Sequence, residues 1–471
     1  MMKKVILLIA AVFGSALMQG KVRLPAILSD NMVLQQQTEA PVWGKAAPGK
    51  KVSVKASWGA SASAVAGSDS LWSVRLKTPS AGGPYTLKIS DGQPVTLSDV
   101  LIGEVWFCSG QSNMEMPVKG FNRQPVEGSL DVILAADPSA PIRLVNVEKG
   151  TSLEPQWDCK VDGWNLNESR PVADASATAY FFGKALYEKL HIPIGLIMTD
   201  WGGTAIEPWM SLETLQGAGY DISQIEAVYP KWKQNTPTAL YNAMVAPLSP
   251  YAVRGFIWYQ GESNRPGRVY SELQTAFGKM LRKCFGDGSD AQPYYFVQIA
   301  PYNYGDPSGT GSGYMYEQQA KTLAMLPNSG MAVTNDIGNL NCIHPANKQE
   351  VGRRLALLAL KNDYGVLGNL AVESPLYEKV EFNGFRATVT FNVGSGSLAP
   401  LGEEIEGFEV AGANKVFHPA SARISGANTV DVWSGTVSDI KAVRYCFRNY
   451  QVGNLTNIFG IPASPFRTDE W

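Results

Sequence analysis

The sequence has little of several features on which common binding sites depend. Its 471 residues carry 40 basic and 42 acidic side chains, a formal net charge of −2. Nucleic-acid-binding domains are usually basic, so nucleic acid is not an expected partner. The 5 cysteines are widely spaced and form no CxxC pair, which fits neither a disulfide framework nor a typical zinc site. We therefore expect no metal and no cofactor, and mostly buried cysteines, with one disulfide left open.

Long apolar runs are also scarce. Lys3 and Lys4 precede an apolar run over residues 5–17, which is shorter than the roughly 20 residues that a membrane-spanning helix needs. A short positive start followed by a short apolar core is typical of a secretory signal peptide. We expect residues 1–20 to be removed, and the mature protein to have no membrane span and to be periplasmic or extracellular.

The rest of the chain changes its hydrophobic pattern twice. Residues 21–100 contain short alternating segments at 52–56, 72–76 and 85–89, separated by turn signals, and this spacing predicts a β-sandwich domain. From about residue 376 to 471 the pattern is again β-rich. Whether these last strands form their own domain or pack onto the first is left open.

Between them, residues 101–375 alternate strand-like and helix-like segments. Apolar runs predict strands, at 101–108, 194–198, 255–259, 294–299 and 331–334. Helical spacing predicts helices, at 175–190, 270–285 and 348–360. Such alternation predicts an α/β domain, a parallel sheet flanked by helices, in which ligands bind at the carboxyl ends of the strands.

A serine and a histidine stand out at such strand ends. Ser112 directly follows the first strand of this domain, where a tight turn can expose a nucleophile, although a helix-capping serine would look similar. A serine nucleophile needs an adjacent base. Of only 3 histidines, His191 lies at a predicted helix end and His418 in the β-rich tail. His344 follows a strand of the same α/β unit and is the best candidate base.

Six segments, in order across nearly the whole chain, carry a resemblance to a known family. They are GEVW at 103–106, SGQSNM at 109–114, WGGT at 201–204, WYQGESN at 258–264, IHPANK at 343–348 and PASPFRTD at 462–469. Together they resemble the bacterial sialate O-acetylesterases of the SGNH hydrolase superfamily. The resemblance implies an SGNH-hydrolase-like fold, with Ser112 as the nucleophile and His344 as the base.

The resemblance also implies an oxyanion hole built from three hydrogen-bond donors. These are the backbone N–H of Ser112, the backbone N–H of Gly202 or Gly203, and a side-chain amide, Gln260 with Asn264 as its rival. Such donors typically contribute about 3–4 kcal/mol each to transition-state stabilisation.

The sequence departs from the family at the acid of the triad. Many SGNH hydrolases carry an aspartate two or three residues before the histidine, where this chain has Asn341 and Cys342. Asp336 is the nearest upstream acid and our predicted third member, although a capping aspartate or a Ser–His dyad would also fit. Three further polar residues of these segments, Asn113, Glu262 and Asn264, are expected to support the site or contact substrate, and Glu262 is a further possible partner of His344.

The predicted function is a serine esterase that removes acetyl groups from carbohydrates through an acetyl-enzyme on Ser112. Its expected partner is an O-acetylated sugar, most of all sialate, with acetylated xylan or another polysaccharide as the alternative. Because the usual acid is missing, a carbohydrate-binding protein without catalysis is a second class of function. A lipase-like esterase fits less well, since the sequence has no extended apolar lid segment.

Overall fold

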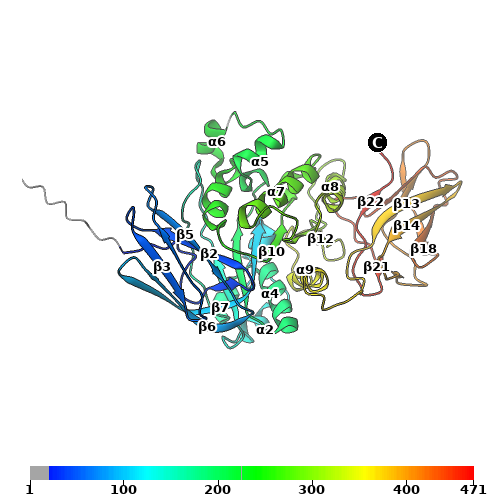
Figure 1. Cartoon of the computed structure of the whole chain (residues 1–471). Helices are drawn as coiled ribbons and strands as arrows, with labels where there is room; N and C mark the ends of the chain where they lie inside the picture. The colour runs from blue at the N-terminus through cyan, green and yellow to red at the C-terminus, as the bar shows by residue number, and fades with distance from the viewer. Residues whose placement is uncertain (1–20, 224) are drawn as a thin grey trace, which may run out of the picture.

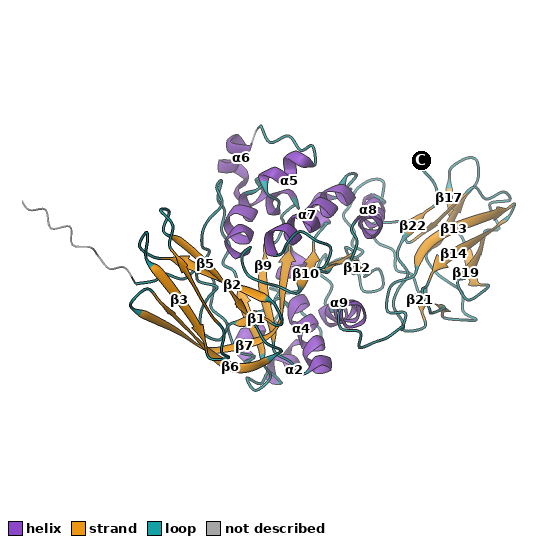
Figure 2. Cartoon of the chain, viewed as in Figure 1, coloured by secondary structure: helices purple, strands orange, loops and turns teal. Residues whose placement is uncertain are grey.

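The computed structural model describes residues 21–223 and 225–471, so the predicted signal peptide lies outside the described residues. An N-terminal β region and a C-terminal β region lie on opposite sides of a central α/β region (Figure 1; Figure 2). Within the described part of the chain, no helix is long and apolar enough to span a membrane.

The N-terminal region is built from short strands, most of them antiparallel, and several have alternating burial. In β5 (Leu71–Lys77), for example, Trp72, Val74 and Leu76 are buried while their neighbours are exposed. The other strands are β1 (Val33–Gln35), β2 (Glu39–Lys45), β3 (Lys51–Ala56), β4 (Ser61–Val65) and β6 (Gly82–Ser90). Strand β2 pairs with β5, while β3 pairs with β4 and β6.

One long strand joins this region to the parallel sheet of the α/β region. Strand β7 (Pro94–Gly110) pairs antiparallel with β6 at its start and parallel with its neighbours at its end. The parallel part of the sheet has the order β8-β9-β7-β10-β11-β12. Its other strands are β8 (Ile142–Asn146), β9 (Ile194–Asp200), β10 (Gly255–Tyr259), β11 (Tyr294–Val297) and β12 (Ser329–Ala332). The predicted domain boundary at residue 100 falls inside β7, and the domain division remains a prediction.

Helices cover both faces of the parallel strands, as predicted. On β7, Trp106 and Cys108 face the core shared with α4 (Ala177–Leu190) and α9 (Lys348–Asn362). Val105 and Phe107 face the opposite core, shared with α7 (Tyr270–Phe285), α8 (Gly311–Met325) and the N-terminal strands. The shorter helices are α1 (Ser112–Glu115), α2 (Ser129–Leu134), α3 (Ser169–Asp174), α5 (Leu212–Gly217), α6 (Ile225–Trp232), η1 (Glu207–Trp209), η2 (Lys233–Asn235), η3 (Tyr241–Val245), η4 (Ala246–Leu248) and η5 (Glu262–Asn264).

The C-terminal strands have a hydrophobic core of their own, which includes Val389, Phe391, Val410 and Tyr445. The strands are β13 (Leu376–Asn383), β14 (Arg386–Asn392), β15 (Leu398–Ala399), β16 (Phe408–Ala411), β17 (Phe417–Pro419), β18 (Ser421–Ile424), β19 (Thr429–Trp433), β20 (Ala442–Tyr445), β21 (Thr456–Asn457) and β22 (Phe466–Arg467). They form sheets β13-β14-β19-β18, β17-β16-β20-β22 and β15-β21. Among the described residues, these sheets contain no strand of the N-terminal β region.

Candidate active site

Ser112 lies at the carboxyl end of the central strand, on a sharp turn into α1. Gly110 ends β7 with φ of 154°, and a Cβ there would lie 2.2 Å from the Tyr259 carbonyl oxygen. The Gln111 N–H donates to the same carbonyl at 3.0 Å, so the turn is pressed against β10. The N–H of Ser112 has no hydrogen-bond partner among the described residues, and a free N–H at a helix start is suited to an anion.

Gln260 does not occupy the place predicted for it. It is fully buried, and its amide nitrogen lies 3.1 Å from Gln111 Oε1, 3.1 Å from the Thr204 carbonyl and 2.8 Å from Asn264 Oδ1. Its own oxygen accepts from the Tyr270 hydroxyl at 2.6 Å. An amide has only two N–H donors, and these acceptors engage both. Gln260 therefore connects Gln111, Thr204 and Asn264 through its amide nitrogen. Neither of its N–H groups is left to bind an oxyanion.

Its rival Asn264 keeps a donor free. Asn264 Oδ1 also accepts from the Ile206 N–H at 2.9 Å, and Asn264 Nδ2 donates to Glu207 Oε2 at 2.9 Å. No other acceptor for this amide is found in the part of the chain that the structure describes. Because the amide has two hydrogens, one is uncommitted, and Asn264 is the better oxyanion-hole candidate of the two.

The two glycines of the loop after β9 differ in their hydrogen bonds. A Cβ on Gly202 would lie 3.2 Å from Ser112 Cβ, so this loop lies against Ser112. The Gly202 N–H donates to Glu115 Oε2 at 2.5 Å, and Lys149 Nζ lies 2.6 Å from the other oxygen of Glu115. The N–H of Gly203 has no partner within residues 21–223 and 225–471. Of the two predicted donors, Gly203 is the one not already engaged.

His344 is oriented by a glutamine. Its Nδ1 lies 2.6 Å from Gln124 Oε1, and since this oxygen can only accept, Nδ1 carries the proton and Nε2 the lone pair. Nε2 is buried and has no hydrogen-bond partner among the described residues. Phe121 packs edge-on against the imidazole with ring centroids 5.3 Å apart. Burial, with the positive charge of Lys348 added, lowers the pKa of His344 to about 4, so the ring is neutral at neutral pH.

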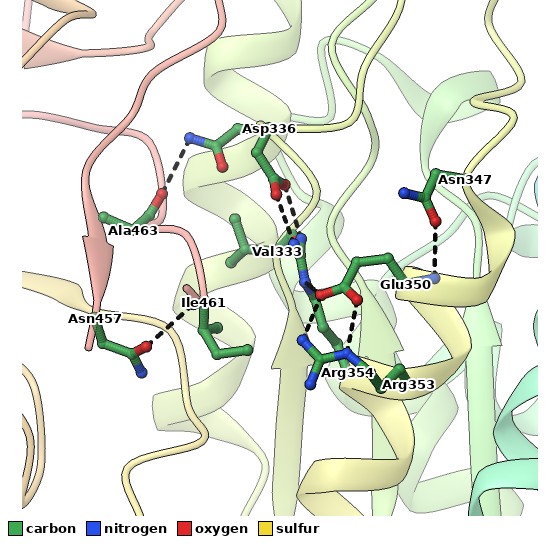
Figure 3. A network of polar contacts seen from close by, with 10 residues as sticks. Val333, Asp336, Asn347, Glu350, Arg353, Arg354, Asn457, Ile461 and Ala463 are labelled. Carbon is green, nitrogen blue, oxygen red and sulfur yellow. Dashed lines mark hydrogen bonds and ion pairs between the residues drawn. The ribbon is translucent and has the colours of Figure 1, made fainter. Parts of the chain in front are cut away.

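Asp336 does not serve as the third member of a triad in this structure. Both of its oxygens accept from the Arg354 guanidinium, at 2.8 and 2.6 Å. Figure 3 shows the carboxylate pointing toward Arg354, which also bonds the Val333 carbonyl and Glu350. No hydrogen bond joins Asp336 to His344 in the described chain. The prediction was wrong because a nearly buried arginine on α9 binds the carboxylate in a bidentate pair.

The side chain of Asn113 links the serine and histidine segments. Asn113 Nδ2 donates to the Ile343 carbonyl at 3.1 Å and to Glu262 Oε1 at 2.6 Å. The residue after Ser112 is thereby bonded to the residue before His344, which brings the two segments together. The other two histidines lie elsewhere, as expected, since His191 caps the end of α4 and His418 is in β17.

Two important residues were not identified from the sequence. Gln124 lies in an irregular loop 220 residues before His344, and nothing in its neighbourhood marks it. Gln111 was quoted only as part of the serine motif, yet its oxygen accepts from the Ser263 N–H at 3.2 Å as well as from Gln260. All five cysteines lie in described residues and are unpaired.

Comparison with known proteins shows which family the chain resembles. A family model described as "Carbohydrate esterase, sialic acid-specific acetylesterase" matches residues 102–361. Sialate O-acetylesterase of Mus musculus is 30% identical over 416 residues, covering 76% of this chain and 76% of that protein. The Homo sapiens protein of the same name is 30% identical over 393 residues, covering 76% of this chain and 74% of its own. The crystal structure of a carbohydrate acetylesterase from Xanthomonas citri aligns with a TM-score of 0.85 and 37% identity, covering 96% of this chain and 100% of that one.

Proposed function

The chain belongs to the carbohydrate esterase family of sialic acid-specific acetylesterases, and from that premise we propose that it hydrolyses O-acetyl esters of sugars through an acetyl-enzyme on Ser112. The observation that carries the proposal is the state of His344. Its Nδ1 is hydrogen-bonded to Gln124, and its buried Nε2 has no partner among the described residues. The carbonyl of Ile343, the residue before His344, accepts from the side chain of Asn113, the residue after Ser112.

In the proposed mechanism His344 acts first as the base and then as the acid. Nε2 takes the proton of the Ser112 hydroxyl as its oxygen attacks the acetyl carbonyl carbon. The sugar alkoxide leaves with that proton, and water then hydrolyses the acetyl-enzyme by the reverse transfers. Gln124 holds the ring in the tautomer that both steps need. The constellation is a Ser–His pair oriented by a neutral amide, in place of a triad with a carboxylate.

The oxyanion that forms during attack needs preorganised donors. The backbone N–H groups of Ser112 and Gly203 and the second amide hydrogen of Asn264 have no partner among the described residues and are available for this role. Neutral donors suit it, because they stabilise the developing charge without a counter-charge that has to be desolvated.

The proposed substrate is an O-acetylated sialate, because the curated relatives of the chain carry that activity in their names. The alternative is an acetylated polysaccharide, supported by the relative from Xanthomonas citri, which is named only as a carbohydrate acetylesterase. Residues 1–20 are proposed to direct the protein across the inner membrane, to the periplasm or the medium, and N-terminal sequencing of the mature protein tests this.

The experiment compares wild type with Ser112→Ala for acetate release from O-acetylated sialic acid and from acetylated xylan. Release that disappears in the variant supports the proposal, and the preferred sugar identifies the substrate. In parallel, a serine-directed organophosphate is applied, and the modified residue is located by mass spectrometry. A protein that releases no acetate and forms no adduct at Ser112 would instead be a carbohydrate-binding protein.

A further inference from the structure

Three buried polar side chains that the proposed mechanism does not use lie beside both proposed catalytic groups. Asn113 and Lys348 are fully buried and Glu262 is 8% exposed. They come from three segments far apart in the chain: the start of α1, the start of η5 and the start of α9. Burying charged groups is unfavourable unless they are paired, so their presence needs a reason.

The asparagine amide bridges the two charged side chains. Asn113 Nδ2 donates to Glu262 Oε1 at 2.6 Å, and Asn113 Oδ1 accepts from Lys348 Nζ at 2.7 Å. An amide is the side chain that can meet a carboxylate at one end and an ammonium at the other. We call these three residues the Asn113 network.

The Asn113 network is hydrogen-bonded to the backbone on both sides of His344. Asn113 bonds the carbonyl oxygen of Ile343, the residue before His344, at 3.1 Å. Lys348 bonds the carbonyl oxygen of Pro345, the residue after it, at 2.8 Å. The backbone around His344 is thus anchored to the residue that follows Ser112, and its position relative to the nucleophile depends on these bonds.

We propose that Asn113, Glu262 and Lys348 are positioning residues, which hold His344 in register with Ser112. This rests on the proposed function, in which His344 is the base. A displacement of the base by about 1 Å lowers the rate by about 10²-fold. Correct placement of His344 is therefore a functional reason to keep charged side chains buried at this position.

The charges around His344 agree with this role. Burial and then Lys348 lower the pKa of His344 to about 4, whereas Glu115 acts in the opposite direction. Burial lowers the pKa of Lys348 to about 7, and Glu262 and Cys342 oppose that shift. Lys348 is therefore protonated throughout the pH range in which His344 titrates.

Glu262 is the acidic member of the Asn113 network. Burial raises the pKa of this carboxyl group, and the hydrogen bond from Asn113 and the charges of Lys348 and Arg265 act against the rise. Its second oxygen, Oε2, is buried without a partner among the described residues. Removing Lys348 alone takes away one of the two positive charges that stabilise this buried carboxylate and lowers the stability of the protein, whereas removing both members of a buried ion pair together is usually tolerated.

The test measures the pKa of His344 directly, by NMR of ¹⁵N-histidine-labelled protein, since the chain has only 3 histidines. Lys348→Met and the double variant Lys348→Met/Glu262→Gln are compared with wild type. The matched control is Lys361→Met, on the last turn of α9, whose Nζ pairs with Glu373. In both network variants the pKa of His344 should rise by about one unit, and kcat should fall by about 10²-fold with KM nearly unchanged. The control should change neither.

Network variants whose His344 pKa and kcat both match wild type would overturn the proposal. A role in stability alone is distinguished by the double variant, which regains folding without restoring the pKa. Failure of the proposed function appears separately, as acetate release by Ser112→Ala equal to that of wild type. The NMR titration does not depend on turnover, so the two failures cannot be confused.

Discussion

Replacing Gln124 by glutamate should convert the proposed Ser–His pair into a carboxylate triad. Gln124 Oε1 already lies 2.6 Å from His344 Nδ1, and glutamate places an oxygen there with nearly the same geometry. An opposite charge this close raises the pKa of a histidine by about 1–3 units. The pKa of His344, lowered to about 4 in wild type, should therefore rise to about 5–7 in Gln124→Glu.

The assay is the pH dependence of kcat/KM for p-nitrophenyl acetate, because its acidic limb reports the pKa of the base in the free enzyme. The limb should move to higher pH in Gln124→Glu, so that this variant loses activity at pH 5 that wild type retains. Gln124→Ala, which removes the acceptor, should lower kcat by about 10²-fold. Asn122→Asp adds the same charge to an exposed position of the same loop and should leave the limb in place.

The reasoning would be refuted by an acidic limb in Gln124→Glu that coincides with that of wild type, together with full activity in Gln124→Ala. Such a result would mean that another group orients the imidazole during turnover. The same shift in Asn122→Asp would assign the effect to the general charge of the loop.

Three further predictions follow from the site. Asp336→Asn should keep kcat within about threefold and lower the free energy of unfolding by about 1–3 kcal/mol, because Arg354 loses its bidentate partner; urea unfolding measures this, and a large loss of kcat at full stability would speak against it. Asn264→Ala should lower kcat by about 10²–10³-fold with little change in KM, whereas Gln260→Ala should mainly lower thermal stability; the opposite pattern would return the oxyanion role to Gln260. In wild type, His344 must be neutral to act as a base, so kcat/KM should hold as the pH falls through 6 and decline only as it approaches about 4; a decline centred near about 6.5, the ordinary value, would show that burial does not act as described.

Local pattern determined much of the architecture. Strand β10 (Gly255–Tyr259) and helix α7 (Tyr270–Phe285) begin and end where the sequence predicted. Each is a run whose apolar spacing matches one type of secondary structure, so its neighbours in the chain suffice to define it. For the same reason Ser112 at a strand end and His344 between a strand and a helix could be selected from sequence.

Only the tertiary structure decided which polar side chains form hydrogen bonds or ion pairs with one another. An imidazole needs an acceptor at Nδ1, but that acceptor can be a carboxylate, an amide or a carbonyl, and it can come from any loop that packs there. Gln124 meets His344 across 220 residues of sequence, and Asp336 is bound by Arg354 instead. Similarly, the burial of Gln260 decides that its amide bonds protein and not substrate. Such choices depend on long-range packing, which leaves no periodic signal in the sequence.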